Sequence, residues 1–90
     1  MISQKDRKII KECAMKYRVS KVLLFGSSLH YGRPRDIDLA VKGISPKIFF
    51  RFYSELYKYL DKPVDLIDLD DADSHLVKRI LEAGKVIYAA

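Results

Sequence analysis

The sequence predicts an α/β (α+β) fold in which a small mixed sheet is covered by helices. Its 90 residues are 49% apolar, enough for one modest core. Segments of helical apolar period alternate with short strand-like segments, and no repeat or linker interrupts them. The expected order is helix, strand, turn or short helix, strand, helix, strand, helix and strand. We therefore expect residues 1–90 to form one domain, whose strand order the sequence does not determine.

The first helix is expected at about residues 3–17, where Ser3 can cap it. Apolar side chains recur on one face and lysines occupy the other. The apolar face comprises Ile9, Ile10, Cys13, Ala14 and Tyr17. Cys13 has no second cysteine to pair with, so we expect a small core residue. The apolar run at 22–25 then predicts a strand that is buried on both faces and ends at Gly26.

Residues 36–42 alternate in character, which predicts a strand with one core face and one functional face. Ile37, Leu39 and Val41 form the apolar face. Asp36, Asp38 and Ala40 form the other. Two carboxylates therefore project from the same side of one strand.

A second amphipathic helix is expected from the Ser45-Pro46 start to about Leu60. Its core stripe comprises Ile48, Phe49, Phe52, Leu56, Tyr59 and Leu60. Phe50, Tyr53 and Tyr57 extend the apolar surface beyond this stripe. These aromatic residues suit either a partner or homo-oligomer interface, or a helix wrapped deeply by its own core.

The last third of the chain predicts a strand, a helix and a final short strand. The strand covers residues 64–69, after Pro63. Asp73 can cap the following helix, which Gly84 ends. Residues 85–88 form the final strand.

The chain carries a net charge of +5 and has a pI near 9.4, which suits an anionic partner such as a nucleotide or a nucleic acid. A solvated basic face explains the same charge. No segment approaches the roughly 20 apolar residues that a membrane-spanning helix needs. No lysine-led apolar leader opens the chain, so we expect a cytoplasmic protein without membrane association.

The carboxylate pair and the Gly-Ser turn together indicate a metal and phosphate site. Asp36 and Asp38 would repel each other unless a cation lay between them, and their oxygens suit Mg²⁺ or Mn²⁺. Gly26-Ser27-Ser28 follows a buried strand, and its backbone N–H groups can approach an anion closely. Taken alone, the carboxylate pair or the turn has an ordinary structural explanation. The combination is much more specific than either part.

Phe25-Gly26-Ser27 followed by residues 36–41, Asp-Ile-Asp-Leu-Ala-Val, resembles the signature of the polymerase-β-like nucleotidyltransferase superfamily. The short chain is similar to its minimal (MNT) branch. The resemblance implies that Asp36 and Asp38 hold the metal ions and that the Gly-Ser turn holds the triphosphate of ATP. It also implies a third carboxylate on a later strand, which helps to activate the acceptor hydroxyl.

The third carboxylate is assigned to Asp65 by resemblance, because Pro63-Val64-Asp65-Leu66 is similar to the family's third motif. Periodicity leaves Asp65 and Asp68 as alternatives on opposite faces of the strand. The implied mechanism is two-metal nucleotidyl transfer catalysed by Asp36, Asp38 and Asp65.

The turn departs from the family pattern in two ways. Ser28, Leu29, His30 and Tyr31 precede Gly32, where many relatives have Arg and Gly directly after Gly-Ser. Arg35 stands where many relatives have Ser. Two alternatives follow. Arg33 and Arg35 contribute phosphate contacts beside Gly26, Ser27 and Ser28, or the reshaped turn weakens triphosphate binding.

Larger relatives carry an additional helical region, for which 90 residues leave no room. Minimal members often act with a separate helical protein of the HEPN type, and some neutralise that toxin by attaching AMP to it. The resemblance therefore implies an antitoxin that adenylylates a HEPN-type partner, and a catalytically weak binding subunit is the alternative. A nucleic-acid binder that uses the basic first helix ranks last, because no RNA-binding aromatic motif or base-reading helix is present.

Overall fold

The computed structural model describes residues 2–26 and 35–90, and within them four strands form a mixed sheet in the order β3-β2-β1-β4. β1 pairs antiparallel with β2 and β4, and β2 pairs parallel with β3. The strands are β1 (Lys21–Leu24), β2 (Ile37–Lys42), β3 (Val64–Asp68) and β4 (Lys85–Ala89). The predicted mixed sheet is therefore confirmed, and its order places the two parallel strands side by side.

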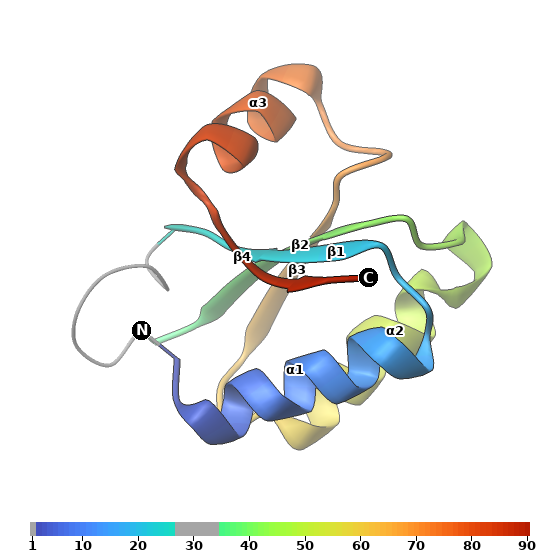
Figure 1. Cartoon of the computed structure of the whole chain (residues 1–90), viewed down its shortest axis with the longest axis vertical. Coiled ribbons are helices and arrows are strands. Elements are labelled where there is room, and N and C mark those ends of the chain that lie inside the picture. Colours follow the sequence, from blue (N-terminus) through green and yellow to red (C-terminus); the bar gives the residue numbers. More distant parts are fainter. Residues whose placement is uncertain (1, 27–34) are drawn as a thin grey trace.

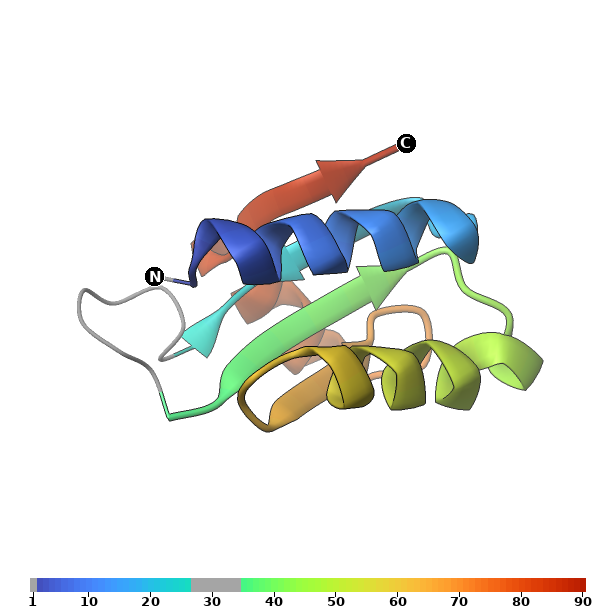
Figure 2. The same cartoon turned by 90° about the horizontal axis from the view of Figure 1, so that it is seen from below.

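Helices cover both faces of this sheet (Figures 1 and 2). α1 (Gln4–Lys16) and α2 (Pro46–Tyr59) lie side by side on one face. α3 (Ser74–Ala83) lies on the opposite face. α2 connects the parallel strands β2 and β3, because parallel neighbours need a crossover connection.

The predicted helix starts are found, although their caps differ. The Ser3 hydroxyl accepts a hydrogen bond from the Asp6 N–H at 3.1 Å. The Asp73 carboxylate accepts one from the His75 N–H at 2.9 Å. Ser45 occupies the cap position of α2 but makes no side-chain capping bond. Each side-chain cap satisfies an N–H group that has no partner within the helix.

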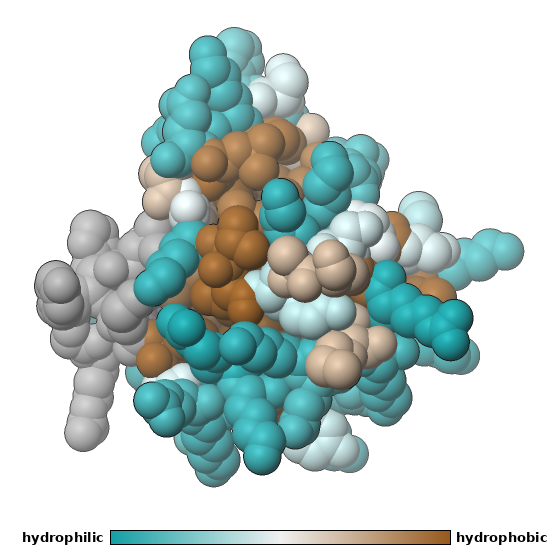
Figure 3. Space-filling model, in the orientation of Figure 1, coloured by the Kyte–Doolittle hydropathy of each residue, from teal (hydrophilic) through white to brown (hydrophobic). Residues whose placement is uncertain are grey.

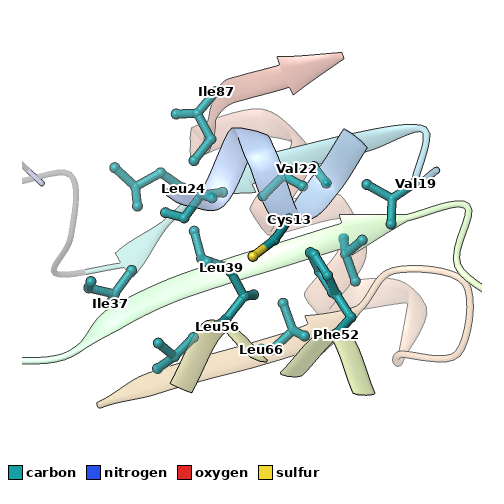
Figure 4. Close-up of a cluster of buried hydrophobic side chains, with 14 of the residues drawn as sticks. Cys13, Val19, Val22, Leu24, Ile37, Leu39, Phe52, Leu56, Leu66 and Ile87 are labelled. Atoms are coloured by element: carbon teal, nitrogen blue, oxygen red, sulfur yellow. The ribbon is translucent and has the colours of Figure 1, made fainter. Parts of the chain in front are cut away.

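The core is divided by the sheet into two clusters. The larger lies between the sheet and the α1–α2 layer (Figure 4), and the smaller lies between the sheet and α3. Buried members of the first include Cys13, Val22, Leu24, Ile37, Leu39, Phe52, Leu56 and Leu66. Those of the second are Leu23, Ala40, Leu69 and Ile80. The alternation of β2 thus directs Ile37 and Leu39 toward α1 and α2 and directs Ala40 toward α3.

Some expected details are wrong. β2 begins at Ile37, so Asp36 lies in the bend before the strand. Tyr59, placed in the core stripe of α2, is exposed. Tyr59 is the last residue of α2. Within the described residues, no helix has the length and apolar character that crossing a membrane requires.

Candidate functional site

Asp38 of β2 and Asp65 of β3 lie directly across from each other on the face of the sheet that α3 covers. They are partners in the parallel register. Both project away from the α1–α2 layer, because their neighbours Ile37 and Val64 point into it. Adjacent strands lie about 4.8 Å apart, so the two carboxylates start from neighbouring backbone positions. Asp38 is half-buried and Asp65 is exposed.

Gly26 brings the end of β1 directly against the Asp38 carboxylate. The Phe25 N–H donates a hydrogen bond to the Asp38 carbonyl oxygen at 3.0 Å, which fixes the strand end beside β2. Gly26 then adopts φ +62°, and a Cβ placed on it would lie 2.7 Å from Asp38 Oδ2. Glycine is required here both for the left-handed backbone and for the close approach. The backbone of Gly26 therefore lies directly beside the Asp38 carboxylate.

Asp36 and Arg35 precede this arrangement in the chain. Both are exposed, in the bend that leads into β2. Ser27, Ser28 and Arg33, the other residues expected to contact phosphate, lie outside the described residues. The sheet thus brings together Gly26, Asp38 and Asp65, with Asp36 two positions before Asp38.

Asp68, the alternative third carboxylate, is the last residue of β3 and bonds to the turn that follows it. It lies three residues beyond Asp65, and its register partner in β2 is Val41, which belongs to the α1–α2 cluster. Its Oδ1 atom accepts a hydrogen bond from the Asp70 N–H at 3.0 Å. Only Asp65 of the two shares the face and the end of the sheet that Asp38 occupies.

The donor set suits a metal that is held jointly by protein and substrate. Among the residues that the structure describes, no three His, Cys, Asp or Glu side chains form a ready-made metal cluster. Mg²⁺ is usually held by one or two carboxylates together with substrate phosphates and water, rather than by an all-protein cage. Asp38 and Asp65 supply two such carboxylates beside a glycine turn, so they fit this kind of metal.

A second polar cluster, which sequence reasoning missed, joins α1 to α2. The Glu55 carboxylate accepts hydrogen bonds from Lys16 Nζ at 2.7 Å, the Tyr17 hydroxyl at 3.2 Å and Cys13 Sγ at 3.4 Å. The bond from Lys16 holds the pKa of Glu55 below its usual 4.5. Burial and the bond to Glu55 raise the pKa of the Cys13 thiol to about 12. This thiol is therefore an inert core group rather than a nucleophile.

The aromatic residues of α2 are divided between the core and the surface. Phe50 and Tyr57 are 74% and 55% exposed. Tyr53 instead packs against the larger core cluster, and its hydroxyl donates a hydrogen bond to the Val64 carbonyl oxygen at 2.7 Å. Only Phe50 and Tyr57 of the expected set are available to a partner.

Comparison with known proteins identifies the class. The sequence model described as "Polymerase beta, Nucleotidyltransferase" matches residues 7–90, so the chain belongs to this family. The resemblance drawn from the Gly-Ser and Asp-x-Asp motifs is thus confirmed. No curated protein is similar enough in sequence to be matched.

Solved structures narrow the likeness to the MNT antitoxins. A chain from tri-AMPylated Shewanella oneidensis HEPN toxin in complex with MNT antitoxin has 26% identity and a TM-score of 0.78, over 99% of this chain and 74% of that one. A toxin–antitoxin structure with AMP-PNP has 26% identity and a TM-score of 0.75, over 93% and 73%. An MntA toxin–antitoxin mutant with two aspartate-to-glutamate changes has 26% identity and a TM-score of 0.76, over 94% and 73%.

Proposed function

We propose that this chain is a metal-dependent nucleotidyltransferase that transfers AMP from ATP to a hydroxyl group of a HEPN-type protein, and so acts as an antitoxin. The observation that carries the proposal is the pairing of Asp38 with Asp65 beside the Gly26 turn. Family membership supports nucleotidyl transfer. The AMP-PNP complex and the AMPylated toxin among the similar structures support adenylate as the group transferred.

The proposal assigns the site residues to two roles, metal binding and phosphate binding. Asp36, Asp38 and Asp65 hold Mg²⁺ or Mn²⁺ together with the triphosphate. The backbone of Gly26, with Ser27 and Ser28, and the guanidinium groups of Arg33 and Arg35 bind the phosphates. When bound, the metal neutralises phosphate charge and lowers the pKa of the acceptor hydroxyl.

The chemistry is an in-line displacement at the α-phosphorus of ATP. The acceptor oxygen forms a bond to this phosphorus, and the bond to the oxygen that bridges the α- and β-phosphates breaks. Pyrophosphate leaves with that oxygen. Asp65 is the exposed member of the pair that it forms with Asp38, and it accepts the proton that the hydroxyl loses.

β3 offers a matched pair of variants to test the proposal. Asp65→Asn should abolish AMP transfer to a HEPN-type protein such as the Shewanella oneidensis toxin, because it removes a charge that faces Asp38. Asp68→Asn makes the same change three residues later on the turn side and should keep the parental rate. Mass spectrometry of the acceptor measures transfer, and circular dichroism checks folding. Equal loss in both variants would contradict the assignment of Asp65.

The second candidate function is a binding subunit with little turnover. It is favoured by the sequence after Ser27, where Ser28, Leu29, His30 and Tyr31 precede Gly32 and the chain departs from the family pattern. Calorimetric titration with ATP and Mg²⁺ separates the two functions. Partner binding that needs neither metal nor nucleotide, with no ATP uptake, would favour the binding subunit.

A further inference from the structure

Four basic side chains surround a hollow on the flank formed by α1 and β4. Arg7, Lys8 and Lys11 come from α1, and Lys85 comes from the first position of β4. The hollow has a volume of about 580 Å³. Hydrophilic side chains gather along this part of the molecule in Figure 3, below the apolar surface near α3. Two elements far apart in the sequence thus direct positive charge into one space.

No acidic side chain in the described part of the chain forms an ion pair with the basic groups of this hollow. Asp6, the acid in the first turn of α1, is only 3% exposed and does not line the hollow. Glu12 lines a separate hollow beside Glu55. Like charges around one space repel each other, so an anion that enters it is attracted by all four.

The lining of the hollow favours phosphate over an acidic protein surface. Among the described residues, the rest of its lining comprises Ile2, which is buried, and Gln4. Protein interfaces depend on exposed aromatic or apolar anchors, and none of the described residues that line this hollow provides one. A nucleic-acid backbone needs only cations and polar donors. We propose that this hollow, a basic groove between α1 and β4, binds the phosphodiester backbone of a nucleic acid without reading its bases.

The position of the groove relates it to the rest of the molecule. Lys85 is the register partner of Leu24, two residues before Gly26. The groove therefore opens at the same end of the sheet as the carboxylates, although on the α1 side. The sequence contains no base-reading element, which disfavours a nucleic-acid partner that is recognised by its bases. Backbone binding needs no such element, and only the fold brings Lys85 beside the basic residues of α1.

Fluorescence anisotropy with a short labelled oligouridylate at increasing salt tests the proposal. Four phosphate contacts predict a slope of about −3 for the logarithm of affinity against the logarithm of salt concentration, because each contact with a single strand contributes about −0.7. The double variant Lys8→Glu/Lys11→Glu should weaken binding by more than about tenfold and flatten the slope by about 1.4. An oligodeoxyuridylate should behave in the same way, since no sugar contact is invoked.

The double variant Lys47→Glu/Lys78→Glu is the matched control. It changes two exposed lysines on α2 and α3 and lowers the net charge by the same four units, from +5 to +1. It should keep most of the affinity and the full slope. Equal weakening by both variants would show a diffuse net-charge effect and overturn the proposal. Absence of binding at low salt, or equally good competition by polyglutamate of equal charge, would also overturn it.

Discussion

Gly26 is the single residue on which the geometry of the carboxylate site depends most directly. Its left-handed backbone and the 2.7 Å spacing between a Cβ and Asp38 Oδ2 leave no room for another side chain. Asp38 is held at the same time by the backbone bond from Phe25. A change at Gly26 therefore alters a functional side chain on a different strand.

Gly26→Ala should lower the free energy of unfolding by about 1–2 kcal/mol, because an L-residue is strained in the left-handed region. It should also weaken the binding of ATP with Mg²⁺, because the new methyl group displaces the Asp38 carboxylate. Chemical denaturation measures the first effect and calorimetry the second.

Gly43→Ala is the control for backbone strain. Gly43 also has a positive φ, +78°, and a Cβ there would collide with Ser20. It follows the opposite end of β2, away from Asp38. We expect a loss of stability with unchanged nucleotide binding. If both alanine variants lost nucleotide affinity equally, the contact between Gly26 and Asp38 would not explain the effect.

Between elements, the contact of α1 with α2 is held by a polar cluster as well as by apolar packing. Glu55 of α2 accepts bonds from Lys16, Tyr17 and Cys13, in or directly after α1. The Tyr17 and Phe52 rings form a T-shaped pair with 5.7 Å between ring centroids. The two helices are thereby fixed side by side over one face of the sheet.

This cluster predicts a pH dependence of stability. The folded pKa of Glu55 lies below 4.5, so its contribution is present above pH 4.5 and is lost as the pH falls through the folded pKa. Glu55→Gln should lose less stability than the parent over this acidic range. Urea denaturation at a series of pH values measures the difference. Glu82→Gln, an exposed change on α3, should keep the parental profile, and a parental profile in Glu55→Gln would contradict the prediction.

The division of the α2 aromatics gives a further prediction at this scale. Tyr53→Ser should cost about 3 kcal/mol, because it removes a ring from the core and the hydrogen bond to Val64. Tyr57→Ser should change stability by less than about 0.5 kcal/mol, since Tyr57 is exposed. Thermal denaturation measures both. Equal effects would place the two rings in equivalent surroundings, contrary to the structure.

Sequence patterns predict those features of this fold that depend on residues close together in the chain. The periods of the helices and of β2 were sufficient because each element has one apolar side that must be buried. The choice between Asp65 and Asp68 required the parallel register with Asp38, which depends on strand order. Lys85 and Glu55 were missed because their partners lie more than 35 residues away. Local spacing carries no signal for such contacts.

For the whole molecule, the strand order divides the sheet into a protected centre and two edges. β1 and β2 have hydrogen-bonded neighbours on both sides, whereas β3 and β4 each have one. We expect the slowest amide hydrogen exchange in β1 and β2, because opening them requires the separation of two ladders. Residue-resolved exchange by nuclear magnetic resonance measures this. Equally slow exchange in β4 would imply that its outer edge is covered, for example by self-association.

The parallel register of β2 and β3 has a consequence for how the protein tolerates mutation. Val64 and Leu66 fix this register by entering the core, and a slip of one residue would turn Asp65 to the opposite face. Apolar side chains that never meet a substrate therefore select which carboxylate faces Asp38. A mutational scan scored for activity would be expected to find sensitive positions among these core residues, even in variants that remain folded and abundant. In such a scan, β3 would show two kinds of sensitive position in alternation: Val64 and Leu66, which hold the register, and Asp65, which acts in catalysis.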